Sequence, residues 1–580
     1  MPLISFEQNG EQKCITMTKF STILQCIRAA GISFELPCSG LGLCGKCKVI
    51  AKGELEAPSS DEKKFIDINK NERLACCAKI VGDVFIEFID RKKEIKTVNS
   101  GITKNVEVHS SINLVDLGSI QRGSYLPFIE TLNYHISDLS IYDKIACIEN
   151  DKKYNDKKLY GVTYGNELID VLNEKKDILA AAIDIGTTGI SAYLINLENG
   201  VILNKTSSLN PQTEFGGDVI SRITYCMNNK DGTLKLKKLI VEEINNLIGK
   251  MIDGEYFKEQ IYNVVIAGNT TMIHLFLGIN PASMAMAPYR AVFLSSGVFK
   301  AGEIGISSNA LGKITVLPGA SSYVGADIIS GIAASGFNKK EKNSIFIDIG
   351  TNGEIAAISN GEMICTSTAA GPALEGMNIS CGCRAEKGAI ESFDIDEEYN
   401  ITYSTIDGAE PFGICGSGLL DIAGSMVERN IILKSGSLNK NMDKRVLGRL
   451  IDKNFYLTDK IFISQKDIRQ IQLAKGAIAA GIKMLLEKIS ISIEDLDEVI
   501  IAGAFGYHIN AISILNIGLI PKGFKGKIIF AGNTSIEGAR LAAVNKFCLE
   551  EMNDIKSRMK TLELSTDSKF QDYFIGELNF

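Results

Sequence analysis

The sequence has few histidines, the residues that can bind zinc or haem, and it has no long apolar run. It contains no Trp and only four His, which are scattered at His109, His135, His274 and His508. This distribution argues against a zinc or haem site built on His. No apolar run approaches the roughly 20 residues that cross a bilayer, so we expect no membrane partner.

The chain also lacks targeting and nucleic-acid-binding signals. Residues 1–10 (MPLISFEQNG) show no basic start followed by an apolar stretch, so we predict no signal peptide and a cytoplasmic protein. The formal net charge is −7, whereas binding to a nucleic-acid backbone requires a basic face. We therefore expect no nucleic-acid partner.

Cysteine, by contrast, is plentiful, with fourteen residues in the chain. In a reducing compartment, clustered Cys serve metals more often than disulfides. Cys38, Cys44 and Cys47 follow the spacing C-x5-C-x2-C, and Cys76 comes later, directly before Cys77. Four thiolates are the ligand set of a [2Fe-2S] cluster, and Cys77 competes with Cys76 as the fourth ligand. A zinc knuckle, the main alternative, requires paired C-x2-C units or His, and neither is present here.

This segment resembles the [2Fe-2S] ferredoxins, with the five-residue first gap of the adrenodoxin-like branch. The resemblance implies Cys76 as the fourth ligand, because the family places that ligand directly after Leu-Ala. Residues 3–7 and 13–17 predict a hairpin around Asn9-Gly10, and residues 21–30 predict an amphipathic helix. Strand, strand and helix are typical of the start of a β-grasp fold.

A length of 580 residues exceeds what one hydrophobic core holds, so we expect three or more folding units. We predict a [2Fe-2S] ferredoxin domain at 1–91 and a charged, turn-rich linker at 92–105. A small α+β middle domain follows at 106–178, with a helix near 167–174. Residues 179–580 form the predicted nucleotide-binding domain.

Two similar strand–turn–strand segments in the last domain indicate an internal duplication. The first carries Asp184 and the turn Gly186, Thr187 and Thr188; the second carries Asp348 and the turn Gly350, Thr351, Asn352 and Gly353. Glycine turns bring backbone N–H groups and Thr hydroxyls against phosphate oxygens. Each Asp can hold Mg²⁺ directly or through water. A plain β-hairpin is the alternative for either copy alone.

Three further small-residue loops follow predicted buried segments. They are Gly268-Asn269-Thr270, Gly416-Ser417-Gly418 and Gly503-Ala504-Phe505-Gly506, the last after a helix at 473–488. The last loop resembles the adenosine motif of the actin, hexokinase and heat-shock chaperone superfamily. No Walker A pattern is present. The resemblance implies that ATP binds between two lobes, each a ribonuclease-H-like sheet with helices.

The whole chain resembles the reductive activators of corrinoid-dependent proteins, in which a ferredoxin domain precedes an actin-like ATPase domain. The motifs that carry this resemblance are AIDIGTTG, AGNTTMIHLFLG, DIGTNGEI, ISCGCRAEKGAIE, GICGSGLLD and IAGAFG. The chain departs from the family at Cys383, which forms a C-x-C pair with Cys381 where a larger apolar residue is expected. Two buried or loop thiols are the favoured interpretation of this pair, and a second metal site is the alternative.

The resemblance implies an ATP-hydrolysing activase that transfers one electron from the [2Fe-2S] cluster to Co(II) of a corrinoid protein, which gives Co(I). Asp184 and Asp348 would be the catalytic residues, with ATP and Mg²⁺ as further cofactors. The partner would be a corrinoid iron-sulfur protein or a methyltransferase corrinoid subunit, and a low-potential donor would reduce the cluster. The sequence leaves open the partner, the donor and the oligomeric state, a homodimer included.

Two other enzymatic functions fit parts of the pattern. One is an ATP-dependent activator of another low-potential enzyme, although such activators carry a bridging [4Fe-4S] cluster and lack the four-Cys ferredoxin. The other is an actin-like metabolite kinase with a redox-sensing ferredoxin domain, in which Asp348 would act on the acceptor. A ferredoxin-bearing filament or scaffold that binds ATP only structurally is the non-enzymatic alternative.

Overall fold

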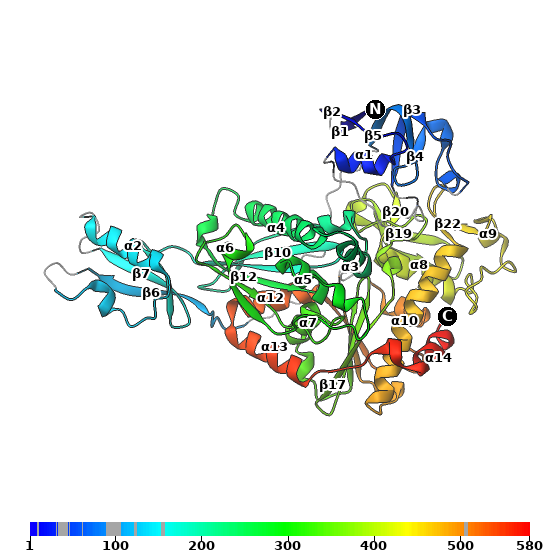
Figure 1. Cartoon of the computed structure of the whole chain (residues 1–580). Helices are drawn as coiled ribbons and strands as arrows, with labels where there is room; N and C mark the ends of the chain where they lie inside the picture. The colour runs from blue at the N-terminus through cyan, green and yellow to red at the C-terminus, as the bar shows by residue number, and fades with distance from the viewer. Residues whose placement is uncertain are drawn as a thin grey trace.

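The computed structural model describes residues 1–8, 11–30, 32, 45, 47–60, 62–88, 106–120, 125–151, 157–503 and 509–580. Figure 1 shows three parts: a small sheet near the N-terminus, a second small sheet that projects from the opposite side, and a large two-lobed body between them. The predicted linker 92–105 lies outside the described residues, and the predicted domain boundaries stay predictions.

The N-terminal part has the β-grasp arrangement that the sequence predicts. Its elements are β1 (Leu3–Gln8), β2 (Glu11–Thr16), α1 (Ile23–Ala29), β3 (Lys48–Leu55), β4 (Glu72–Leu74) and β5 (Ile80–Phe88). The strand order is β2-β1-β5-β3-β4, with β1 parallel to β5. Ile4, Phe6, Ile23, Ile27 and Ile86 form the core between α1 and the sheet. The predicted hairpin and helix are confirmed.

The middle unit, which we define as the described residues from 106 to 178, is a three-stranded antiparallel sheet with one helix. It contains β6 (Ile112–Ser119), α2 (Leu139–Asn150), β7 (Lys158–Tyr164) and β8 (Glu167–Leu172). The predicted helix near 167–174 is wrong, because Leu168, Ile169, Asp170 and Val171 are all buried in β8. A short apolar run that is buried throughout lacks the alternation that distinguishes a strand from a helix.

The middle unit is attached to the large body by backbone and side-chain contacts. His109 N–H donates to Val544 O at 2.9 Å, and Lys546 N–H donates to His109 O at 3.0 Å. Tyr262 Oη donates to the buried carboxylate of Asp170 at 2.7 Å. Ile112, from β6, also belongs to a hydrophobic core of the large body.

Each lobe of the large body is built on a six-stranded sheet; five strands follow the same order in both sheets, and the sixth lies at opposite edges. The first sheet runs β11-β10-β9-β12-β14-β13 and the second runs β25-β24-β15-β16-β17-β26. The first contains β9 (Leu179–Ile185), β10 (Gly189–Asn196), β11 (Ile202–Leu209), β12 (Ile261–Gly268), β13 (Gly297–Lys300) and β14 (Lys313–Val316). The second contains β15 (Ser344–Ile349), β16 (Gly353–Ser359), β17 (Glu362–Thr368), β24 (Glu498–Ala502), β25 (Lys527–Gly532) and β26 (Lys560–Thr561).

In both sheets a three-stranded antiparallel meander is followed by two parallel strands, which confirms the predicted duplication. The first lobe also carries α3 (Val219–Asn228), α4 (Gly232–Met251), α5 (Thr270–Leu277) and α6 (Ala301–Ile304). The second carries α8 (Gly416–Glu428), α9 (Lys444–Leu447), α10 (Gln465–Lys488), α11 (Ala511–Asn516), α13 (Lys546–Arg558) and α14 (Ser568–Gly576). It also has two small sheets, formed by β18 (Ala389–Ile395), β19 (Ile401–Thr405) and β20 (Gly413–Ile414), and by β21 (Leu450–Ile451), β22 (Asn454–Tyr456) and β23 (Phe462–Ser464).

Two helices, α7 (Ala326–Ser335) and α12 (Thr534–Val544), form one core with both sheets (Figure 1). This shared core contains Tyr193 from the first sheet, Phe346 from the second and Ile329 and Ile536 from the two helices. Small residues let the helices approach closely, since a Cβ built on Gly538 would lie 2.4 Å from Ser330 O. Within the described ranges, we find no helix with the length and apolar composition needed to cross a membrane.

We predict that Gly538→Ala lowers the stability of the large body. The new methyl group would overlap the backbone of α7, and such overpacking costs about 1–3 kcal/mol. Differential scanning calorimetry of the full chain should show a lower unfolding midpoint. Gly249→Ala on α4 is the matched control, because a Cβ there meets nothing within 4 Å and Ala stabilises a helix interior by up to about 1 kcal/mol. An unfolding midpoint for Gly538→Ala as high as that of the control would contradict the close contact between α12 and α7.

Candidate functional site

Two glycine turns at the ends of β9 and β15 form the centre of the candidate nucleotide site. Gly186, Thr187 and Thr188 connect β9 to β10, and Gly350, Thr351 and Asn352 connect β15 to β16, which begins at Gly353. A Cβ on Gly268 would lie 2.7 Å from Ile185 O, and one on Gly503 would lie 2.5 Å from Ile349 O. Equivalent glycines therefore let a neighbouring strand approach each turn equally closely.

Hydrogen bonds from α3 and from the start of α5 fix the first turn. Asn269 caps α5 by accepting from Met272 N–H, and its Nδ2 donates to Thr187 Oγ1 at 2.9 Å. Arg222, on α3, is fully buried and donates to Thr187 O and to Gly216 O. Thr270 begins α5 and donates to Ser321 O. The sequence analysis missed Arg222, which lies in no recognised motif.

Residues at the start of α12 hold the carboxylate of the predicted Asp184. Asn533 Nδ2 donates to Asp184 Oδ2 at 3.1 Å, and Ser535 Oγ donates to Asp184 Oδ1 at 2.7 Å. These two residues were missed, although Gly532-Asn533-Thr534 repeats the pattern of Gly268-Asn269-Thr270. Asn533 caps α12 as Asn269 caps α5. The repeat was therefore available as a sequence signal.

Three further carboxylates, which the sequence analysis did not single out, lie close to Asp184 and Asp348. They are Asp327 at the start of α7, Glu354 in β16 and Glu375 in the short 3-10 turn η9 (Pro372–Glu375). Glu375 Oε2 accepts from Thr188 Oγ1 at 3.3 Å and from Thr351 Oγ1 at 3.2 Å, so it joins the two turns. Glu354 belongs to the motif DIGTNGE, which was a readable signal.

The crowding of carboxylates disfavours their charged forms. Burial together with the Asp184 and Glu375 carboxylates raises the pKa of Asp348 to about 7. Burial and the carboxylates of Asp348 and Asp184 likewise raise the pKa of Asp327. Burial also raises the pKa of Asp184, against the hydrogen bonds from Ser535 and Asn533. Bound cations would reverse this effect, because a nearby positive charge favours the ionised form.

The remaining predicted nucleotide-binding residues belong to the start of α8 and to the segment after β24. Gly416, Ser417 and Gly418 begin α8 and pack against β18, since a Cβ on Gly418 would lie 2.2 Å from Ile390 O. Gly503 follows β24, whereas Ala504, Phe505 and Gly506 lie outside the described residues. In the part of the chain that the structure describes, no three His, Cys, Asp or Glu side chains form a metal site by themselves.

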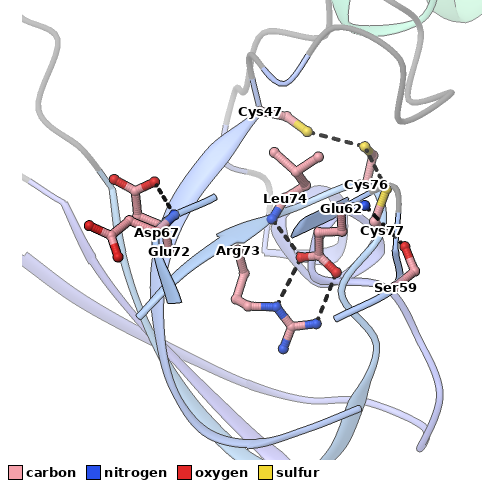
Figure 2. Close-up of polar contacts among 9 residues, drawn as sticks. All are labelled: Cys47, Ser59, Glu62, Asp67, Glu72, Arg73, Leu74, Cys76 and Cys77. Atoms are coloured by element: carbon pink, nitrogen blue, oxygen red, sulfur yellow. Dashed lines mark hydrogen bonds and ion pairs between the residues drawn. The ribbon is translucent and has the colours of Figure 1, made fainter. Parts of the chain in front are cut away.

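The ferredoxin part brings two of the predicted cluster ligands together. Cys47 Sγ and Cys76 Sγ are 3.1 Å apart, and Cys77 Sγ is 3.6 Å from Cys76 Sγ (Figure 2). Cys38 and Cys44 lie outside the described residues. Two converging sulfurs fit the soft ligand set of an iron–sulfur cluster.

A buried ion pair fixes the strand that leads to Cys76. Arg73 Nε and Nη2 donate to the two oxygens of Glu62 at 2.9 and 3.1 Å, and Leu74 N–H donates to Glu62 Oε1 at 2.9 Å (Figure 2). Ala75 N–H donates to Cys47 O at 2.8 Å. Glu62 and Arg73 therefore set the position of Cys76 relative to Cys47.

The Cys381–Cys383 segment forms part of a packed loop. Cys383 N–H donates to Ile414 O at 2.8 Å, and Ile414 N–H donates to Cys381 O at 2.9 Å. A Cβ on Gly413 would lie 2.6 Å from Cys383 Sγ. This close contact explains why glycine suits position 413 beside Cys383.

With metal and nucleotide removed by a chelator and dialysis, we expect the thermal unfolding midpoint to fall as pH rises. The pKa of Asp348 is raised from 3.8 to about 7, so the folded chain keeps a proton that the unfolded chain releases. This contribution to stability is complete below about pH 4 and is lost as pH rises through about 7. Scanning calorimetry at a series of pH values measures the midpoint. Asp348→Asn stays neutral at every pH and should show a shallower fall, whereas equal slopes would assign the effect to other groups.

Three family models match the ferredoxin part and the two lobes of the large body. A family model described as a 2Fe-2S iron-sulfur cluster binding domain matches residues 6–81. A model of the RACo middle region matches 179–340, the first lobe, and a model of the C-terminal ASKHA domain of RACo matches 342–580, the second lobe.

Relatives match over nearly the whole chain. The corrinoid activation enzyme RamQ of Eubacterium limosum is 31% identical over 602 residues, which cover 98% of this chain and 97% of that protein. A Methanosarcina barkeri [Co(II) methylated amine-specific corrinoid protein] reductase is 27% identical over 432 residues, covering 69% of this chain and 76% of that protein. The solved structure of a reductive activator for corrinoid, iron-sulfur protein matches with a TM-score of 0.75 and 29% identity, covering 100% of this chain and 98% of that one. The chain therefore belongs to the RACo family of corrinoid-protein activators, in which a 2Fe-2S domain precedes an ASKHA domain.

Proposed function

We propose that this chain reduces the Co(II) form of a corrinoid protein to Co(I), with one electron from a [2Fe-2S] cluster and with ATP. The observation that carries this proposal is the match of the whole chain, ferredoxin part included, to corrinoid activators. Those relatives favour this function over the radical-enzyme activator, kinase and scaffold alternatives. A cytoplasmic location, an upstream low-potential donor and a homodimer stay predictions.

Cys38, Cys44, Cys47 and Cys76 are the proposed cluster ligands. A low-potential [2Fe-2S] ferredoxin cluster exchanges single electrons at roughly −400 mV. If the cobalt couple lies about 120 mV lower, the transfer is unfavourable by about a hundredfold, since 59 mV is tenfold for one electron. An ATP-dependent change in the chain would have to shift that balance through its partner.

The two turns of the large body supply the proposed nucleotide contacts. Thr187, Thr188 and Thr351 would donate to phosphate oxygens, while Asp184 and Asp348 would hold Mg²⁺ through water and the phosphates. The glycines at the ends of β12 and β24 keep side chains away from this region. The proposed nucleotide-binding set is Gly186, Thr187, Thr188, Gly268, Asn269, Thr270, Gly350, Thr351, Asn352, Gly353, Gly416, Ser417, Gly418, Gly503, Ala504, Phe505 and Gly506.

The decisive test of the proposed function is an anaerobic reduction assay. The pre-reduced full chain is added to Co(II) corrinoid proteins with and without Mg-ATP, and the absorbance of Co(I) is followed. We expect Co(I) to form only with Mg-ATP. Absence of Co(I) with both a corrinoid iron-sulfur protein and a methyltransferase corrinoid subunit, despite an intact cluster and ATP hydrolysis, would contradict the proposal.

We predict that Cys76→Ser removes the visible absorbance of the cluster and that Cys77→Ser retains it. The two thiols are neighbours in sequence, but Cys76 Sγ lies 3.1 Å from Cys47 Sγ. The measurement is the iron and sulfide content and the visible spectrum of both variants. Loss of the cluster in Cys77→Ser alone would exchange their roles. Loss of the cluster in both variants would mean that both thiols are required, and it would contradict the assignment of Cys76 alone as the fourth ligand.

A further inference from the structure

The Glu375 bridge, which we define as the hydrogen bonds from Thr188 and Thr351 to Glu375, joins the two lobes. A single carboxylate oxygen accepts from both hydroxyls, at 3.3 and 3.2 Å. The backbone N–H of Thr351 also donates to this carboxylate. A Cβ built on Gly350 would lie 3.5 Å from the other oxygen, Oε1. A negative group is thus held against both glycine turns.

The donors that hold Glu375 are the kind that bind phosphate. Hydroxyl and backbone N–H groups in glycine turns form anion sites, and they serve a carboxylate or a phosphoryl oxygen equally. Glu375 also adds negative charge to a region that already contains Asp184 and Asp348, and it contributes to the raised pKa of Asp348. Its carboxylate and a nucleotide phosphate would therefore compete for the same donors and repel each other.

Two glycines with positive φ bound the turn that carries Glu375. Glu375 ends the turn η9, which is flanked by Gly371 with φ of +73° and Gly376 with φ of +76°. Both glycines adopt left-handed conformations, which other residues rarely adopt. Ala373 and Leu374 of the same turn are buried in the core of the second lobe, so a movement of Glu375 would be passed to the elements that pack around η9.

We propose that Glu375 is a substitute anion that holds the two lobes together in the nucleotide-free chain and is displaced by the phosphates of ATP. This inference rests on the proposed assignment of the two turns as the nucleotide site. Because η9 contacts both α8 and α10, displacement of Glu375 also moves a segment packed against these two largely buried helices of the second lobe. Binding of nucleotide would thereby change the packing around α8 and α10.

The test compares Mg-ATP binding by the full chain and its Glu375→Gln variant, measured by isothermal titration calorimetry. Removal of the competing charge should tighten Mg-ATP binding roughly fivefold to tenfold, because a larger fraction of the chain is then competent to bind. Glu375→Ala, which removes the charge and the acceptor, should bind at least as tightly. A residue that only supported the fold would weaken binding when replaced.

Glu410→Gln is the matched control, because Glu410 is exposed on the same lobe and its replacement makes the same change in net charge. We expect this variant to bind Mg-ATP as the unmodified chain does. Unchanged or weaker binding in Glu375→Gln would overturn the proposed displacement while leaving the nucleotide site intact. Failure of the unmodified chain to bind Mg-ATP would overturn the nucleotide site and the displacement together.

Discussion

The packing of α7 and α12 between the two sheets is the constraint on which the rest of the large body depends. Side chains from both sheets and both helices belong to one continuous apolar core. Burial of apolar surface is non-directional, but the close approach of Gly538 to Ser330 restricts the angle at which the helices can cross. The relative position of the two glycine turns follows from that crossing, since each turn leaves a strand of one of the two sheets.

Electrostatics places a second constraint on the same region. Five carboxylates gather at the junction of the lobes, and burial makes their ionised forms costly. Without a cation the chain reduces this cost by retaining protons on residues such as Asp348. Carboxylates that bind a metal must be deprotonated, so loading of the site should release protons. The proposed nucleotide and cation would therefore contribute to the electrostatic balance of the site together with Arg384, which opposes the rise that burial causes in the pKa of Glu375. The ferredoxin part instead balances Glu62 with Arg73.

The strands and turns of the duplicated sheets could be predicted because each sequence copy shows a buried apolar run, an Asp and a glycine turn. The β-grasp hairpin and helix were likewise visible as local patterns. Glu375 could not be predicted, because its importance comes from contacts with Thr188 and Thr351, of which Thr188 is distant in sequence. Arg222 was missed for the same reason. The error at 167–174 arose because burial of the four central residues of β8 hides the alternation of its side chains.

The attachment of the middle unit has a mechanical consequence. His109 is hydrogen-bonded to the last residue of α12 and to the first residue of α13, and Asp170 is hydrogen-bonded to Tyr262 of the first lobe. The unit is therefore held both by the first lobe and by the junction of α12 and α13, and it should move with these elements as one piece. Because it extends away from the helix pair (Figure 1), it acts as a lever arm: displacement grows in proportion to distance from the axis. A rotation too small to disturb the packing of α7 and α12 would become a much larger translation at α2.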